Sequence, residues 1–212
     1  MGDRMNEPIF PDILKQLIAM YEQEYKKDGI HITSLVQCLR KAYYDQFAEP
    51  DLEHRLRRPL FEGTAIHKFI EYLVEKYGSK LMQKIQSEVE IEYQINGVKI
   101  IGRADAVLDD RVVEIKTTTN LPKKPYPSHV LQANTYAYIL KKPKFEIIYI
   151  GDYGVTSFVM KTSKEYFDYV IERAKILMKA FRSSVPPEKE PSILCPKCRY
   201  YHICFKQMKL DL

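Results

Sequence analysis

The segment Gly102–Lys116 restricts the fold more than any other part of the sequence, because it reads as a β-hairpin. Two runs of alternating apolar residues meet at Asp109 and Asp110, residue types that tolerate turn geometry. A two-residue loop, the commonest length in hairpins, places Val107 opposite Val112. The same register sets three further opposed pairs: Leu108 with Arg111, Asp105 with Glu114, and Arg103 with Lys116.

The two faces of this hairpin differ in character, since side chains alternate between faces and opposed residues share one. One face is expected to collect charged side chains: Arg103, Asp105, Glu114 and Lys116. The other face is expected to be apolar and able to pack on a core: Ala104, Ala106, Val113 and Ile115.

The carboxylates of Asp105 and Glu114 would repel each other across the strand pair, which is locally unfavourable. A Mg²⁺ or Mn²⁺ ion between them would remove the repulsion, since these cations prefer carboxylate oxygens. Lys116 beside such a cation could help to activate a water or stabilise a charged transition state. Salt bridges to Arg103 and Lys116 are the competing explanation. The hairpin alone leaves both interpretations open.

The composition favours one globular domain with room for a small appendage. The chain has 212 residues, of which 45% are hydrophobic and 29% charged, and its net charge is +5. This modest excess of positive charge is compatible with nucleic acid binding but does not require it. The sequence shows no apolar run long enough to span a bilayer and no signal peptide, so we expect a cytoplasmic protein.

Hydrophobic periodicity and turn residues predict alternating helices and strands. A strand, helix and strand between residues 112 and 150 indicate a parallel crossover. The expected fold is therefore α/β (α+β-like), with a mixed central β-sheet flanked by helices. The predicted helices are 12–28, 35–47, 60–77, 128–140 and 163–181, and the predicted strands are 84–93, 98–108, 111–117, 145–150 and 155–161.

Several polar residues outside the hairpin are candidates for function. His67 lies in the first turns of a predicted helix, where a single histidine is more often a hydrogen-bonded structural residue. Gln132 and Tyr136 are four residues apart and share a helix face, either at a site or on the surface. Two basic pairs in polar loops are candidates for phosphate contacts or plain solvated surface: Arg57 with Arg58, and Lys123 with Lys124.

Three cysteines lie close together near the end of the sequence, after a proline-rich segment. Cys195, Cys198 and Cys204 form a metal-site pattern, and Cys38 would supply a fourth thiolate. Four thiolates suit zinc or an iron–sulfur cluster, and the spacing excludes neither. Structural disulfides are not expected in a cytoplasmic protein.

The order of these motifs resembles the RecB-type branch of the PD-(D/E)XK nucleases that carries an iron–sulfur cluster. Within that branch, the size of the chain resembles the CRISPR-associated exonucleases, the fourth family of Cas core proteins. The similarity rests on Cys38, 63–67, 102–105, 114–116, 132–136 and the three later cysteines. The acidic motif reads Gly-Arg-Ala-Asp and lacks the proline of the superfamily name, a common departure in this branch.

The resemblance implies a role for each motif. His67, Asp105 and Glu114 would bind Mg²⁺ or Mn²⁺ through their side chains, and Ile115 through its carbonyl. Lys116 would orient or activate the attacking water, while Gln132 and Tyr136 would line the active site and contact the DNA. The family also implies a [4Fe–4S] cluster, held by all four cysteines: Cys38, Cys195, Cys198 and Cys204.

The resemblance further implies a single-stranded DNA exonuclease, often acting 5′ to 3′, that trims fragments for a Cas integrase. The alternatives are a recombination or repair nuclease like the nuclease module of AddB, and a non-catalytic DNA-binding adaptor of the integration complex. The expected organisation is a helical segment at 1–59, a nuclease core at 60–182, and a linker with an iron–sulfur segment at 183–212. The sequence leaves the oligomeric state open, homo-oligomers included.

Overall fold

The computed structural model describes residues 16–17, 20, 29–48, 58–81, 84–95 and 97–205, without the side chains of 58–61, 79 and 81. Most of the predicted first helix, 12–28, and Arg57 lie outside these residues. Within the described part of the chain, no helix has the length and apolar character needed to cross a bilayer.

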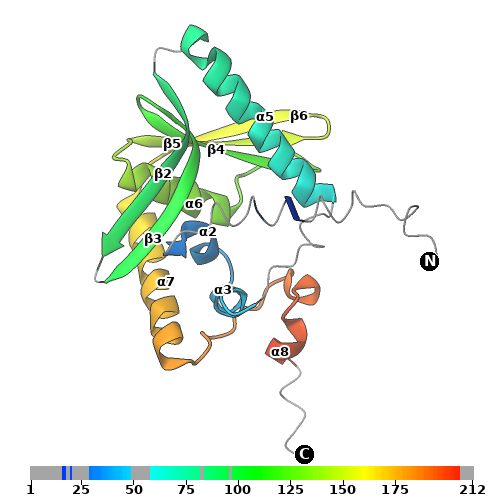
Figure 1. Cartoon of the computed structure of the whole chain (residues 1–212), viewed down its shortest axis with the longest axis vertical. Helices are drawn as coiled ribbons and strands as arrows, with labels where there is room; N and C mark the ends of the chain where they lie inside the picture. Colours follow the sequence, from blue (N-terminus) through cyan, green and yellow to red (C-terminus); the bar gives the residue numbers. More distant parts are fainter. Residues whose placement is uncertain are drawn as a thin grey trace, which may run out of the picture.

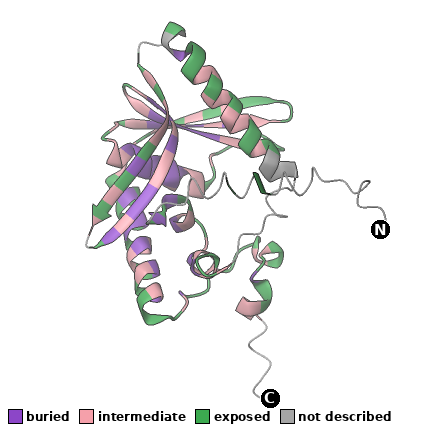
Figure 2. Ribbon diagram, viewed as in Figure 1, coloured by how far each residue is buried: buried purple, intermediate pink, exposed green. Residues whose placement is uncertain are grey.

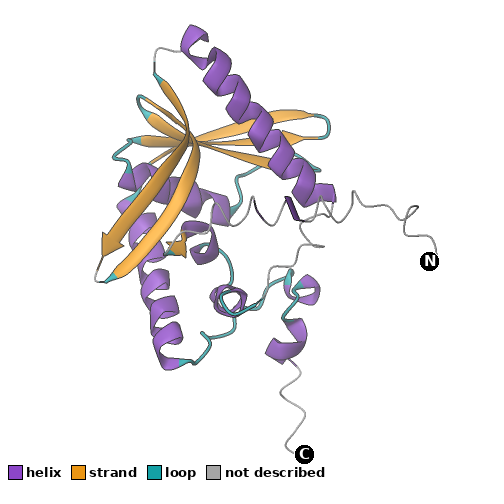
Figure 3. Ribbon diagram, in the orientation of Figure 1, coloured by secondary structure: helices purple, strands orange, loops and turns teal. Residues whose placement is uncertain are grey.

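A six-stranded mixed sheet forms the centre of the molecule (Figure 1 and Figure 3). Its strands follow the order β1-β3-β4-β5-β6, and β2 pairs with β3 outside this path. The β4–β5 pair is parallel, as the strand–helix–strand pattern predicted, and β2–β3, β3–β4 and β5–β6 are antiparallel. The strands are β1 Ile30–His31, β2 Ile85–Ile95, β3 Val98–Leu108, β4 Arg111–Thr118, β5 Lys144–Gly151 and β6 Gly154–Lys161.

Helices cover both faces of the sheet, which confirms the predicted arrangement of a mixed sheet flanked by helices. Near the C-terminal end of the described chain, α8 (Tyr201–Phe205) lies away from the sheet, whereas α2 (Ile32–Leu35), near the other end, packs against it (Figure 1). The helices are α2 Ile32–Leu35, α3 Leu39–Asp45, α5 Arg58–Leu81, α6 Pro127–Ile139, α7 Lys164–Ser183, the 3₁₀ turn η2 Cys195–Lys197 and α8 Tyr201–Phe205.

The sheet separates two apolar clusters of unequal size. The larger one joins α6 and α7 to Val107, Val112 and Phe145, and buried residues concentrate there in Figure 2. The smaller one joins Ile70 of α5 to Ala106 and to further residues of β4 and β5. Neighbouring residues of β3 thus contribute to different clusters, so α5 and α6 lie against opposite faces of the sheet.

Two predicted helices have different boundaries from those expected. The helix predicted at 35–47 is shorter and begins later, as α3 Leu39–Asp45, and Leu35 instead ends α2. Arg173 of α7 donates to the carbonyls of Leu35 and Gln37, just ahead of α3. The helix predicted to end before Gly78 continues through it to Leu81. A Cβ at Gly78 would lie 2.7 Å from Ile85 Cγ2, so glycine serves close packing against β2 here rather than helix termination.

Candidate active site

The β3–β4 hairpin has the predicted register, with Val107 opposite Val112 and Ala106 opposite Val113 across a two-residue turn. The pairing of β3 with β4 ends at Ala106 and Val113, so Asp105 and Glu114 lie where the two strands separate. Further along the same edge of β3, β1 pairs with 100–101. Within the described residues, no strand pairs with 102–105 on that side. We call this interruption between β3 and β4 the seam.

The predicted alternation along the hairpin holds for only part of β3. Ala106 belongs to the small cluster below α5, as expected for its face, together with Val113 and Ile115. Ala104, which was predicted to share that face, belongs instead to the larger cluster on the α6 side. Ladder pairing with β2 is interrupted between these two residues, opposite Glu88, whose φ is +50°. This local change in β2 accompanies the shift in face.

Asp105 occupies the seam with its side chain. One carboxylate oxygen, Oδ2, accepts a hydrogen bond from the backbone N–H of Ile115 over 2.6 Å. The other, Oδ1, lies 3.3 Å from Nδ1 of His67 on α5. The hydrogen bond to Asp105 raises the pKa of His67, although burial of the ring opposes that shift. The sequence therefore brings Asp105 and His67 together as the motif order predicted.

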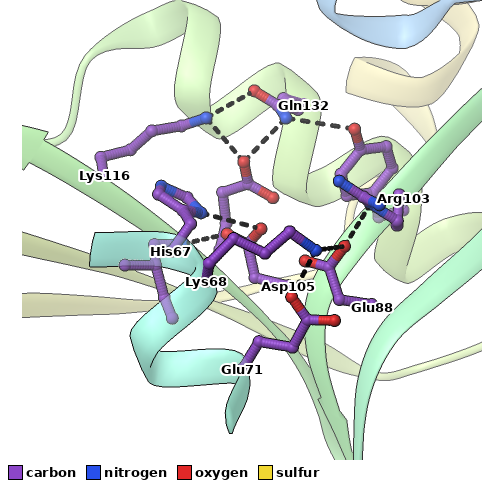
Figure 4. A network of polar contacts seen from close by, with 11 residues as sticks. His67, Lys68, Glu71, Glu88, Arg103, Asp105, Lys116 and Gln132 are labelled. Carbon is purple, nitrogen blue, oxygen red and sulfur yellow. Dashed lines mark hydrogen bonds and ion pairs between the residues drawn. The ribbon is translucent and has the colours of Figure 1, made fainter. Parts of the chain in front are cut away.

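A second group of polar contacts lies on the α6 side of the seam (Figure 4). Lys116 Nζ donates to Glu114 Oε1 over 2.6 Å and to Gln132 Oε1 over 3.0 Å. Gln132 Nε2 in turn donates to Glu114 Oε1 over 2.7 Å and to the Tyr136 hydroxyl over 3.1 Å. The alternative reading of Gln132 and Tyr136 as a surface pair is wrong, because both side chains are buried.

Tyr136 also supports the edge of β3 that lacks a strand partner. Its hydroxyl oxygen accepts a hydrogen bond from the backbone N–H of Arg103, and burial raises the pKa of this phenol. A Cβ at Gly102 would lie 2.6 Å from Tyr136 Cε1, closer than real Cβ contacts. Glycine at 102 is therefore what lets the tyrosine ring approach the strand.

Glu114 is the most unusual group of the site. The residue is 2% exposed, and its second carboxyl oxygen, Oε2, has no hydrogen-bond partner within the described structure. Burial raises the pKa of Glu114, while the charge of Lys116 opposes the shift and Asp105 adds to it. A buried carboxylate oxygen without a partner is costly, since its charge is removed from water without compensation.

Lys116 is held in its protonated form. Burial disfavours the charge, but the neighbouring Glu114 outweighs burial and raises the pKa of Lys116. The ammonium can therefore donate hydrogen bonds and stabilise negative charge, whereas it has no lone pair with which to take a proton from water.

A third polar group beside Asp105 was not predicted from the sequence. Glu88 of β2 lies 2.5 Å from Arg103 Nε and 3.7 Å from Lys68 Nζ, and Lys68 also contacts Glu71 at 2.5 Å (Figure 4). Arg103 was expected to lie beside Lys116 but turns to this group. Glu88 follows the ordinary polar alternation of its strand, so no sequence signal separates it from Gln86 or Glu90.

The donor set of the seam fits a hard divalent cation in its chemistry. Asp105 and Glu114 provide carboxylate oxygens from two strands, and Glu114 Oε2 is an orphaned oxygen that a cation would satisfy. In the described part of the chain, no three His, Cys, Asp or Glu side chains are gathered as a preformed metal group. The side chains would therefore move from their present hydrogen bonds to hold a cation together.

The C-terminal segment that carries three of the cysteines contacts helix α3, whose N-cap residue is Cys38. Tyr200 Oη donates to Asp45 Oδ1 over 2.8 Å, and its ring lies 5.2 Å from that of Tyr44. Burial raises the pKa of the Cys204 thiol, and Cys198 and Cys38 are near enough to add to the shift. The segment thus approaches Cys38, while the four thiols do not form a closed metal group among the described residues.

The basic candidates for DNA contact are described unevenly. Lys123 and Lys124 are exposed in the loop between β4 and α6. Arg58 lies at the start of α5, outside its predicted loop, and its side chain is not described. Arg57 lies outside the described residues.

Comparison with known proteins identifies the family. The model of the PD-(D/E)XK nuclease superfamily matches residues 12–205. The chain belongs to the PD-(D/E)XK nuclease superfamily. The resemblance inferred from the motifs is therefore confirmed.

Several individual proteins are also similar to the chain. The chain is 26% identical over 151 residues to the CRISPR-associated exonuclease Cas4 of Saccharolobus solfataricus, covering 65% of this chain and 71% of that protein. Its fold matches the crystal structure of SSO0001 with a TM-score of 0.73 at 21% identity, over 95% of this chain and 98% of the other. An alkaline exonuclease from Laribacter hongkongensis gives a TM-score of 0.47 at 11% identity, over 74% and 89%.

Proposed function

We propose that this PD-(D/E)XK protein is a divalent-metal-dependent exonuclease that degrades single-stranded DNA in the 5′ to 3′ direction. We further propose that it acts in the cytoplasm, where it trims DNA fragments for spacer acquisition by Cas integrase proteins. Membership of the superfamily supports the nuclease activity. The similarity to the Cas4 exonuclease supports a role in spacer acquisition.

The buried carboxylate of Glu114 carries this proposal. A buried carboxyl oxygen without a hydrogen-bond partner is unfavourable in a purely structural role, yet it is what a cation-binding site needs. The charged group next to it, Lys116, compensates only the other oxygen. Asp105 and His67 lie across the same seam and complete a donor set of the expected kind.

In this proposal His67, Asp105, Glu114 and the carbonyl of Ile115 hold Mg²⁺ or Mn²⁺. When bound, such a cation polarises a phosphate oxygen and lowers the pKa of a coordinated water. Asp105 keeps β4 in position through its bond to Ile115 N–H while presenting a carboxylate to the site. The amide of Gln132 orients both neighbours, since it donates to Glu114 and accepts from Lys116.

Lys116 has the role of an electrostatic stabiliser. Its ammonium is protonated and points into the site, so it donates to a phosphate oxygen as negative charge develops in the transition state. The amide of Gln132 and the phenol of Tyr136 are neutral donors beside it and would contact the DNA. Lys123 and Lys124, with Arg57 and Arg58, would bind the phosphate backbone in a salt-dependent manner.

We also propose a [4Fe–4S] cluster held by Cys38, Cys195, Cys198 and Cys204, with a structural role. The approach of the C-terminal segment to α3 supports this, since the thiols of Cys198 and Cys204 lie near enough to Cys38 to interact electrostatically. In this proposal residues 183–212 are a linker and cluster segment, 1–59 contributes Cys38, and 60–182 forms the nuclease core.

Digestion of single-stranded DNA labelled at either end tests the proposal, with Mg²⁺, Mn²⁺ or EDTA present. We expect products to be released from the 5′ end with either metal and not with EDTA. Glu114→Ala and Lys116→Ala should each abolish most of the activity, whereas Lys175→Ala, an exposed lysine of α7, should not. Digestion by Glu114→Ala at the wild-type rate would exclude this site, and binding of DNA without cleavage under any metal would favour the adaptor.

A further inference from the structure

The face of α6 that reaches the catalytic network continues outward to an exposed aromatic ring. Residues three or four apart share a helix face, which aligns Tyr136, Gln132, His129 and Tyr126. Tyr136 and Gln132 are buried at the seam, whereas Tyr126, the residue that precedes α6, is 47% exposed. This row of side chains therefore runs from the reacting centre to solvent.

Tyr149 connects the outer end of the row to Lys116. It lies beside Lys116 in the parallel β4–β5 ladder, and its hydroxyl lies 2.9 Å from His129 Nδ1. The same hydroxyl accepts the backbone N–H of Tyr126 over 3.0 Å. Burial and the charge of Lys116 lower the pKa of His129 to about 4, so its imidazole is neutral near pH 7. Tyr126 is thus fixed by its backbone close to the proposed site.

The ring of Tyr126 makes two T-shaped contacts, while the residue stays 47% exposed. Its contacts with His129 and Tyr149 have centroid distances of 5.5 and 5.8 Å and interplanar angles of 84° and 77°. Neither neighbouring ring lies parallel on it. An aromatic ring that is positioned in advance and exposed to solvent offers a binding surface at low entropic cost.

The charge around Tyr126 suits a polyanion. The first turn of α6 contains no acidic residue, and its N-cap makes no side-chain hydrogen bond to the helix. Lys123 and Lys124 are exposed in the loop that leads to Tyr126. A nucleic acid strand could therefore pass this ring without meeting negative charge from the helix end.

We propose that Tyr126 stacks on an unpaired nucleobase of the strand whose phosphate occupies the seam. Stacking on an aromatic side chain requires a base that is free of its own neighbours, which single-stranded DNA provides and a duplex does not. The inference rests on the proposed nuclease function and gives its substrate preference a physical cause. Because every base has a π-face, the contact would be tolerant of sequence.

The test is a double-mutant cycle that measures how binding affinity depends on the Tyr126 ring and on a single base of the strand. Affinity for a short single strand in EDTA is measured by fluorescence anisotropy for the wild type, Tyr126→Ala and Tyr126→Phe. The strand carries either all its bases or one abasic nucleotide, moved along it position by position. Stacking is worth about 1–3 kcal/mol per base, so Tyr126→Ala should bind the complete strand about 5- to 150-fold more weakly.

Tyr126→Phe should bind like the wild type, and one abasic position should weaken the wild type while leaving Tyr126→Ala unchanged. Tyr166→Ala, which removes a ring of 37% exposure from α7, is the matched control and should bind normally. Thermal unfolding of Tyr126→Ala verifies that the fold is retained, and duplex of the same sequence should show little dependence on residue 126.

Two failures are distinguishable. Suppose that the wild type digests DNA with Mn²⁺, and that the loss of affinity caused by Tyr126→Ala is the same on every abasic strand as on the complete strand. The stacking proposal is then wrong, and the nuclease assignment stands. If the wild type neither binds nor digests DNA, the proposed function and the stacking fail together.

Discussion

The Asp105 carboxylate accepts the backbone N–H of Ile115 at 2.6 Å, so a side chain takes the place that a strand would hold in an unbroken ladder. The same carboxylate contacts His67 through its other oxygen. Asp105 therefore has a structural and a proposed chemical function at once, and substitutions can separate the two.

Asp105→Asn should preserve the fold and remove metal binding. The amide oxygen of asparagine can still accept Ile115 N–H, but the neutral side chain is a poor ligand for a hard cation. Asp105→Ala leaves the buried Ile115 N–H without a partner and should cost about 1–3 kcal/mol of stability. Urea unfolding and calorimetric titration with Mn²⁺ measure the two effects. Equal stability of the two variants would show that the Ile115 bond contributes nothing.

Divalent metal should stabilise the protein through Glu114. A ligand that binds only the folded state at 100 times its dissociation constant adds about 2.7 kcal/mol. For a chain of this length, that corresponds to a rise in Tm of roughly 5–10 °C. Thermal melts with and without Mn²⁺ measure the shift. Glu114→Ala should show no rise, whereas Glu172→Ala, an exposed glutamate of α7, should respond as the wild type does.

Gly102→Ala should disturb the site without changing any polar group. The added Cβ would lie 2.6 Å from the ring of Tyr136, which is 2% exposed and has little room to move. Overpacking of this kind costs about 1–3 kcal/mol, and displacement of Tyr136 would also release its bond to Gln132. Unfolding and single-stranded DNA digestion should both report a loss. Wild-type activity in Gly102→Ala would indicate that the placement of Tyr136 is unimportant.

Arg173→Ala should loosen the C-terminal segment from α3. Its guanidinium donates to Leu35 O over 2.5 Å, to Gln37 O and to Glu190, which itself accepts Leu39 N–H over 2.8 Å. Loss of these charge-assisted bonds should destabilise the protein by about 2 kcal/mol. Limited proteolysis should then cleave the segment near Glu190 first. Arg182→Ala, at the end of the same helix, is the control.

The contribution of Glu190 to stability should depend on pH. Partial burial opposes its ionisation, but the hydrogen bonds from Arg173 and Leu39 outweigh burial and lower the pKa of Glu190. A carboxyl with a lowered folded pKa stabilises above its unfolded pKa, about 4.3, and loses that effect as the pH falls through the folded value. The stability difference between wild type and Glu190→Gln should be constant above pH 6 and shrink below about pH 4. A constant difference down to pH 2 would contradict this linkage.

The hairpin shows how far local pattern predicts structure. Alternation and a two-residue turn were enough to place Val107 opposite Val112, because both signals act between neighbouring residues. The same pattern placed Ala104 on the wrong face. The face that Ala104 occupies depends on the backbone conformation of Glu88 in β2, and the periodicity of β3 does not predict that conformation.

The remaining differences also have tertiary causes. Gly78 lies inside α5 because the side chain of Ile85 needs the space, and Arg173 of α7 binds the carbonyls of Leu35 and Gln37 where α2 ends and before α3 begins. The motif order did indicate that His67 and Gln132 approach the hairpin. It did not indicate that they come from opposite faces and meet where the sheet is open.

The seam has a mechanical consequence. Across most of the sheet, backbone hydrogen bonds resist separation of the strands, but among the described residues β3 and β4 pair only through Ala106 with Val113 and Val107 with Val112. Force applied across the sheet would part it there first. Two side-chain links resist separation there. Asp105 of β3 accepts the backbone N–H of Ile115 in β4 directly, and Gln132 and Tyr136 of α6 connect Lys116 in β4 to the backbone N–H of Arg103 in β3. The side chains proposed to take part in catalysis thus also hold the two halves of the sheet together.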